Sequence, residues 1–169
     1  MNPIPFGSGM IQMTVKRNKS GFNRIWPKYT LHLSSNDRFL LTCKKRAGNK
    51  TSNYMFSLSQ DNPKRDSPQY IGKLRSNFSG TEYASYDHGE NPEEFQKLGD
   101  ITKIRTEQAV ILYEKQASGK NGPRKMKIIL PIVYMGGKQE VVRPLRKEDT
   151  LLHQFSSNKL DKLVVMFNK

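Results

Sequence analysis

Apolar and polar residues alternate along most of the chain with a period of two, the pattern that predicts half-buried β-strands. The run 29–33 shows it simply, because Tyr29, Leu31 and Leu33 alternate with polar residues. The run 107–116 is more continuously apolar, which indicates a strong strand. Ten strands are predicted, over residues 11–17, 29–33, 39–46, 53–58, 70–75, 81–87, 107–116, 126–134, 139–143 and 163–167.

Helical patterns are few and short. Residues 93–98 fit a single helical turn, and residues 148–155 fit a short helix that begins at Asp149 or Thr150. Sequences rich in Gly, Pro, Asn and Ser separate the apolar runs, at spacings of about 8–12 residues. Many short strands with frequent turns and almost no amphipathic helix predict an all-β fold, either a sandwich or a barrel.

The length of the chain limits its organisation to one domain. It has 169 residues, which suffices for one ordinary domain and not comfortably for two. Residues 1–9 are rich in Pro and Gly and are predicted to be a disordered start. Residues 10–169 carry enough aliphatic and aromatic side chains for a core, so they are predicted to form the domain.

Positive charge is in large excess and is unevenly distributed. The formal net charge is +14, which attracts polyanions such as nucleic acid, an anionic membrane surface or acidic proteins. Residues 16–75 contain 14 basic and 3 acidic residues, residues 76–119 contain 4 and 8, and residues 120–147 contain 8 and 1. Two basic blocks that flank an acidic one predict a molecule with one basic face.

The single cysteine and the apolar runs suggest a compartment. Cys43 has no partner for an internal disulfide, which is typical of a reducing compartment, and we expect it to be a buried or half-buried filler. The beginning of the chain lacks the pattern of a signal peptide. No apolar run approaches the length of about 18 residues that a membrane span needs. We therefore expect contact with a membrane only at its cytosolic surface.

The titratable residues do not form a catalytic or metal-binding pattern. His32, His88 and His153 are isolated and lack the spacing of a metal site. We expect His32 to point outward from its strand and His88 to be a turn residue. Glu93 and Glu94 are adjacent, and neighbours in sequence point in different directions. No phosphate-binding glycine loop is present, so the chain is predicted not to be an enzyme, with no cofactor, no metal and no catalytic residues.

A group of basic residues on the predicted strands is the best candidate site. Side chains two residues apart on a strand share a face, which brings Lys44 and Arg46 together and likewise Lys73 and Arg75. Arginine offers a planar pair of donors to phosphate oxygens, while lysine acts as a point charge. The alternative is that these cations only protect strand edges from aggregation. The anion site predicted from this pattern comprises Lys44, Arg46, Lys50, Lys73 and Arg75.

Several multi-residue motifs resemble the tubby domain. They are KTSNY at residues 50–54, YIGKLRSN at 70–77, YDHGENP at 86–92, GPRKM at 122–126 and WPKYTLHL at 26–33. The motifs occur in the family's order, and the resemblance extends over residues 10–169. The run KKRAGNK is less basic than the family's usual sequence, which predicts a lower affinity for an anionic ligand.

This resemblance implies a fold. Tubby domains are closed antiparallel barrels of twelve β-strands around one apolar C-terminal helix. The chain ends at Lys169, before the closing strands and that helix, so we expect a partial tubby-type β-barrel that stays incomplete. Loss of a core helix would exceed the roughly 5–15 kcal/mol that holds a domain together, so a chain without a stable fold is one alternative.

The resemblance also implies a function. Tubby domains bind phosphatidylinositol 4,5-bisphosphate and hold their proteins at the plasma membrane, and family members carry membrane-protein cargo to cilia. The family's headgroup site corresponds here to Lys44, Arg46 and Arg75. Lys50, Lys73 and Arg124 match the family's motifs and are weaker candidates.

Two functions from different classes therefore remain. The first is a non-enzymatic, monomeric adaptor that binds the phosphoinositide from the cytoplasm and acts in trafficking to the cilium or in signalling. The alternative is a module that binds DNA or regulates transcription in the nucleus through its basic face. The sequence shows no recognition helix and no set of stacking aromatic residues, which such modules use.

Overall fold

The computed structural model describes residues 4, 7–61, 63–114 and 124–168. Nine strands in this part of the chain form one antiparallel sheet, in which each strand pairs with the next strand in the sequence. The order along the sheet is therefore the order along the chain. The strands are β1 (Met13–Asn18), β2 (Lys28–Leu33), β3 (Phe39–Lys45), β4 (Asn53–Ser57), β5 (Tyr70–Ser76), β6 (Glu82–Asp87), β7 (Glu107–Tyr113), β8 (Met126–Pro131) and β9 (Leu163–Phe167).

The helices are short. The described α-helices are α1 (Phe95–Leu98) and α2 (Leu151–Ser156), and the described 3-10 turns are η1 (Gly21–Arg24), η2 (Pro92–Glu94), η3 (Ile101–Lys103) and η4 (Lys147–Asp149). The hydroxyl of Thr150 accepts a hydrogen bond from the His153 N–H at 3.2 Å, which confirms Thr150 as the start of α2. Among the described residues, no helix has the length and apolar character to span a membrane.

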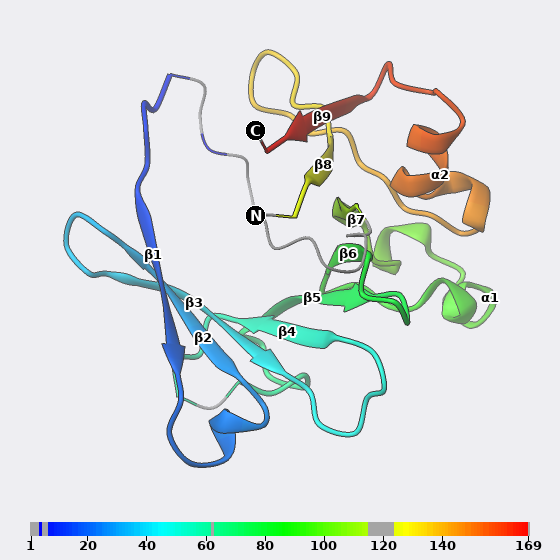
Figure 1. Cartoon of the computed structure of the whole chain (residues 1–169). Coiled ribbons are helices and arrows are strands. Elements are labelled where there is room, and N and C mark those ends of the chain that lie inside the picture. Colours follow the sequence, from blue (N-terminus) through cyan, green and yellow to red (C-terminus); the bar gives the residue numbers. More distant parts are fainter. Residues whose placement is uncertain (1–3, 5–6, 62, 115–123, 169) are drawn as a thin grey trace.

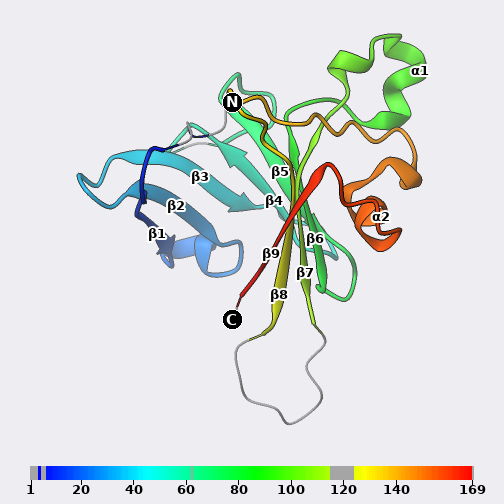
Figure 2. The same cartoon turned by 90° about the horizontal axis from the view of Figure 1, so that it is seen from above.

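The sheet is curved and open. Figure 1 shows β1 and β9 at the two ends of the curve, with α1 and α2 outside it, and Figure 2 shows the same arrangement from above. The prediction of an all-β antiparallel fold is confirmed. Closure into a barrel is not found in the described part of the chain, because β1 and β9 are edge strands that do not pair with each other.

The hydrophobic core lies between α2 and the last four strands. Val110 of β7, Ile129 of β8 and Leu163 of β9 are buried together with Leu151 of α2, and Ala84 of β6 packs against them. Ala84, Val110 and Ile129 are direct cross-strand neighbours, so they point to the same face of the sheet. We call this face, which α2 covers in part, the outer face.

The prediction of a strand over residues 139–143 is wrong. Gln139 forms an isolated bridge with Val133, and Val142 forms another with Glu107. The segment therefore has only single bridge partners and does not form a ladder. Val142 nevertheless joins the core, in which 7% of its surface is exposed.

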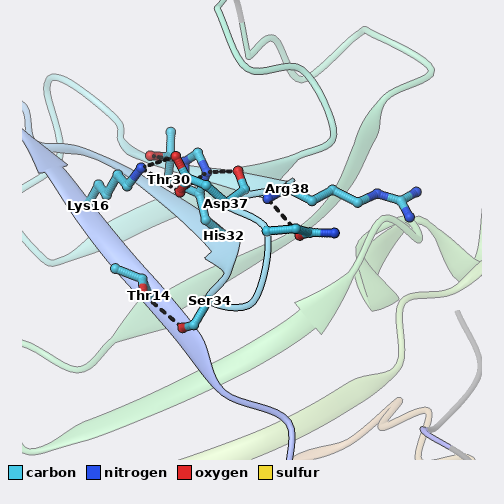
Figure 3. Close-up of polar contacts among 8 residues, drawn as sticks. Thr14, Lys16, Thr30, His32, Ser34, Asp37 and Arg38 are labelled. Carbon is cyan, nitrogen blue, oxygen red and sulfur yellow. Dashed lines mark hydrogen bonds and ion pairs between the residues drawn. The ribbon is translucent and has the colours of Figure 1, made fainter.

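The surface exposure predicted for His32 is also wrong, because only 7% of its surface is exposed. Its Nδ1 lies 3.0 Å from the backbone oxygen of Asp37, and its Nε2 lies 3.0 Å from Oγ1 of Thr30 (Figure 3). The ammonium of Lys16 binds the Asp37 carboxylate at 2.6 Å and thereby lowers the pKa of that carboxyl group. The turn between β2 and β3 folds back over the imidazole, so the face assigned to His32 from the alternation is covered.

Candidate cation site

Lys44 and Lys73 point to the same face of the sheet. Lys44 of β3 lies opposite Met55 of β4, Met55 lies opposite Lys73 of β5, and Lys73 lies opposite Tyr86 of β6. Directly opposed residues of antiparallel strands project to the same side. The two lysines are therefore two strands apart on one face, a separation of about 10 Å.

Arg46 and Arg75 occupy the next positions on that face. Asn53 lies opposite Arg75, and Arg75 lies opposite Ala84, which belongs to the outer face. The Arg46 N–H donates to the Asn53 carbonyl at 2.8 Å, which extends the same register by one position. All four cations of the predicted strands thus lie on the outer face, and Lys44 and Arg75 are not on opposite sides of the molecule.

Arg105 joins this group, although the sequence pattern did not single it out. Its guanidinium lies 4.6 Å from the ring centroid of Tyr86, which is the cross-strand partner of Lys73. Its Nε is buried and has no hydrogen-bond partner. Gly89 allows this placement, because a Cβ there would come within 2.5 Å of the Arg105 backbone. We call Lys44, Arg46, Lys73, Arg75 and Arg105 the cation face.

Carboxylates offset the positive charge of the cation face only through longer-range attraction. No ion pair within 4.0 Å joins any of the five residues to an acidic side chain among the described residues. Burial, together with the charges of Arg105, Arg75 and Arg65, lowers the pKa of Lys73 to about 8. Burial also lowers the pKa of Arg105, and the charge of Arg75 adds to this effect. Each cation therefore destabilises its neighbours, and an anion bound here would relieve that repulsion.

Glu107 separates the cation face from the core. Its carboxylate accepts the Leu151 N–H at 2.7 Å and a hydrogen bond from the Tyr86 hydroxyl. Only 3% of its surface is exposed, and burial raises its pKa against the opposing effect of these two donors and Arg105. The chain of contacts from Arg105 through Tyr86 and Glu107 thus reaches the first residue of α2.

Several surface pockets of about 280 Å³ each lie beside the cation face, and two of them contain its strand residues. The first lies at the cationic end of β3 and is lined by Trp26, Lys44, Lys45, Arg46, Ala47, Met55 and Pro63. The residues that line the second include Arg75, Tyr83, Tyr86, Glu107, Lys147 and Leu152. A larger pocket of about 530 Å³ is lined by four acidic and three basic residues, so it has no excess of positive charge for an anion.

Comparisons with known proteins identify the family of the chain. The family model described as Tub family matches residues 1–169. This chain belongs to the Tub family. It is 37% identical to Tubby-related protein 3 of Mus musculus over 172 residues, with 99% of this chain and 37% of that protein covered. It is 34% identical to Tubby-related protein 1 of Mus musculus, with 100% of this chain and 31% of that protein covered.

A relative from a third kind of tubby protein is also similar. Tubby protein homolog 1 of Caenorhabditis elegans is 35% identical over 172 residues, with 95% of this chain and 40% of that protein covered. The chain therefore spans between about a third and two fifths of the length of these Tub family relatives.

The structure separates two other predicted site residues of this Tub family chain from the cross-strand positions above. Lys50 is exposed in the connection between β3 and β4. Arg124 is exposed two residues before β8, and its carbonyl accepts a hydrogen bond from Nδ2 of Asn168 at 2.9 Å. Arg124 thus precedes the first residue of β8, and five positions along the chain separate it from Ile129.

The described residues contain no group of three or more His, Cys, Asp or Glu side chains that could hold a metal ion. Burial raises the pKa of the Cys43 thiol to about 12, so the thiol is protonated near neutral pH and is a poor nucleophile. Cys43 is half-buried, as predicted. The chemistry that the site supports best is electrostatic binding of an anion.

Proposed function

We propose that the cation face binds the headgroup of phosphatidylinositol 4,5-bisphosphate and holds the chain at the cytoplasmic surface of the plasma membrane. The observation that carries the proposal is the shared face of Lys44, Arg46, Lys73 and Arg75, with Arg105 beside them. Phosphate groups on one inositol ring present several negative charges within a small volume. Cations on β3 and β5, two strands apart on one face, can contact more than one of these groups at once.

The electrostatics favour such a ligand. Charge-assisted hydrogen bonds to phosphate contribute about 1.5–3 kcal/mol each, and Arg75 and Arg105 can donate in pairs. Lys73 and Arg105 are half-buried, so their charges are less screened by water than those of exposed cations. Each basic residue near an anionic leaflet adds about 1 kcal/mol, which gives a reversible attachment.

Membership of the Tub family supports a role as a monomeric, non-enzymatic adaptor that needs no cofactor. In this role the lipid is the membrane partner, and a membrane protein or a trafficking complex is the second partner. Trafficking to the cilium is the proposed process, with signalling at the plasma membrane as its variant.

Vesicle sedimentation tests the proposal. Phosphatidylcholine vesicles with phosphatidylinositol 4,5-bisphosphate should sediment the chain, and vesicles without it should not. Lys44→Ala with Arg46→Ala, and separately Arg75→Ala, should weaken binding at least tenfold, because each loses about 1.5 kcal/mol or more. Arg38→Ala is the matched control, because Arg38 is exposed in the β2–β3 turn at the opposite end of the strands (Figure 3). Unchanged binding by the Lys44 and Arg46 variant would contradict the site.

Nucleic acid is the rival ligand, and the net charge of +14 favours it. A protein that neutralises several backbone phosphates loses affinity steeply as salt rises, because condensed counterions are released on binding. Duplex DNA binding should therefore be measured at two salt concentrations. If the chain binds DNA tightly near physiological salt and Arg75→Ala abolishes this binding, nucleic acid is the ligand of the cation face. That result would overturn the lipid proposal.

A further inference from the structure

The connection between β1 and β2 exposes large apolar side chains. Phe22 is 80% exposed and Ile25 is 66% exposed, and Trp26 follows them directly. Residues of this size are normally buried, and an exposed apolar group with a polar rim marks an interaction surface. We call residues 19–26 the β1–β2 tip.

The tip has a defined backbone conformation. The Ile25 and Trp26 N–H groups both donate to the Phe22 carbonyl, at 3.2 and 3.0 Å, and the Asn23 N–H donates to the Ser20 carbonyl at 3.1 Å. The rings of Phe22 and Trp26 stack, with their centroids 6.2 Å apart and their planes at 28°. The turn therefore holds the Phe22 ring against Trp26 and leaves Phe22 and Ile25 largely exposed.

The tip adjoins the cation face. Trp26 lines the pocket that also contains Lys44, Arg46 and Met55. The Lys45 N–H donates to the Pro27 carbonyl at 3.0 Å, which fixes the end of the tip against β3. An occupant of this pocket would therefore lie beside the apolar side chains of the tip.

The charges around the tip have one sign. No acidic residue occurs anywhere between Lys16 and Asn36. Within this interval Arg17, Lys19 and Arg24 are exposed. An apolar tip surrounded by cations matches the interface of an anionic bilayer, where apolar groups reach the acyl boundary and cations remain among the headgroups. A protein partner with a neutral apolar surface would leave these cations without complementary charge.

We propose that the β1–β2 tip inserts Phe22 and Ile25 into the interfacial layer of the bilayer, next to the lipid headgroup held by the cation face. This inference rests on the proposed function and adds a second, apolar contact to it. Trp26 would then lie at the headgroup level, which is the position that tryptophan prefers at membrane surfaces. The electrostatic contact selects the lipid, and the apolar contact prolongs the attachment.

Fluorescence gives a direct test, because Trp26 is the only tryptophan in the chain. The full chain is titrated with phosphatidylcholine vesicles containing phosphatidylinositol 4,5-bisphosphate, and in parallel with vesicles containing phosphatidylserine instead. We expect the Trp26 emission to shift to shorter wavelength on binding. Lipids brominated near the top of the acyl chain should quench that emission, and lipids brominated near its end should not.

Two variants separate insertion from headgroup recognition. Phe22→Ser with Ile25→Ser should weaken vesicle binding at least about tenfold, because two large apolar contacts are lost. The affinity of the same variant for soluble inositol 1,4,5-trisphosphate should stay within about twofold, because exposed substitutions away from the ligand have small effects. Met135→Ser is the matched control, because Met135 is 104% exposed in the turn after β8, at the opposite end of the strands. It should leave vesicle binding unchanged.

The outcomes distinguish the two proposals. Failure to bind the soluble headgroup, with Trp26 still inserting into phosphatidylserine vesicles, would overturn the proposed function and leave the insertion standing. Vesicle binding with an unshifted, unquenched Trp26 and with full affinity of the Phe22 and Ile25 variant would overturn the insertion alone. A blue shift that depends on protein concentration without vesicles would show that a second copy covers the tip, which also overturns it.

Discussion

The outer face of the sheet carries different side chains in its two halves. Over β6 to β9 the outer face carries apolar side chains, and α2 covers them with Leu151, which is fully buried. Over β3 to β5 the same face carries Lys44, Lys73 and Arg75, and no acidic residue of the described chain pairs with them. The first half lowers the free energy of the folded chain, while the second half raises it and keeps charge available for a ligand.

The difference is produced by side chains at equivalent positions. Arg75, Ala84, Val110 and Ile129 follow one another across four strands. The backbone pairing is continuous through this series, so a single change from Ala84 to Arg75 marks the boundary between the core and the cation face. The sheet therefore carries a group of like charges directly beside its core, within one domain.

The largest expected effect is on the core half. Leu151→Ala removes a side chain with 0% exposure and should lower the free energy of unfolding by about 2–5 kcal/mol. Urea denaturation followed by circular dichroism measures this change. Headgroup affinity per folded molecule should not change. A loss below about 1 kcal/mol would mean that α2 does not stabilise this face.

Glu107, which lies between the cation face and the core, should give an intermediate effect. Glu107→Ala leaves the Leu151 N–H and the Tyr86 hydroxyl without their acceptor, which should cost about 1–3 kcal/mol in the free energy of unfolding. Glu107→Gln retains an acceptor oxygen and should cost less, so it serves as the control. Equal losses in the two variants would show that the charge of Glu107, rather than its hydrogen bonds, stabilises α2.

The cation half should respond with the opposite sign. Lys73→Met replaces a half-buried cation by an apolar side chain of similar length, so the free energy of unfolding should stay equal or rise by up to about 1 kcal/mol. Headgroup affinity should fall about tenfold, because a charge-assisted contact is lost. Calorimetric titration and a urea melt of the same variant give both values. A clear loss of stability would remove the contrast between the two halves.

Headgroup affinity should also depend on pH through Lys73. Its pKa in the free chain is lowered to about 8 and a bound anion must raise it, so binding takes up a proton above about pH 8. Affinity should therefore fall as pH rises through that value, by at most about tenfold per pH unit. A titration from about pH 7 to about pH 10 checks this, and the Lys73→Met variant should lack the step. A fall of equal size in that variant would assign the step to another group.

The smallest effects should come from cations outside the shared face. Arg124→Ala and Lys50→Ala should each change headgroup affinity by no more than about threefold, because both side chains are exposed and screened. Arg105 belongs to the cation face, so Arg105→Ala should instead lower headgroup affinity about tenfold, because its guanidinium lies beside Lys73 and Arg75. A loss with Arg124→Ala as large as that with Arg75→Ala would extend the site to the β7–β8 hairpin.

Much of the fold could be predicted from the alternation of apolar and polar residues. Nine of the ten predicted strands are present, because hairpin sheets with one packed face impose a period of two. The segment 139–143 fits the pattern equally well but forms only isolated bridges, with Val133 and Glu107. The alternation also assigned His32 to the correct face and could not show that the β2–β3 turn covers that face.

The candidate site could be predicted only in part. The spacing of Lys44 with Arg46, and of Lys73 with Arg75, placed each pair on one face, but their common face depends on cross-strand register. Arg105 lies in an irregular segment after η3, where no alternation marks its direction. Its position two residues before Glu107, the first residue of β7, was the available signal.

The close approach of Gly89 to Arg105 bears on how the chain tolerates amino-acid replacement. Any side chain at Gly89 would push against the backbone that carries Arg105, within 2.5 Å. In a library of single replacements, this loop glycine should therefore behave like a ligand contact, although it offers no group to a ligand. We therefore expect relatives of this chain to keep glycine at this position, while exposed positions such as Lys50 vary.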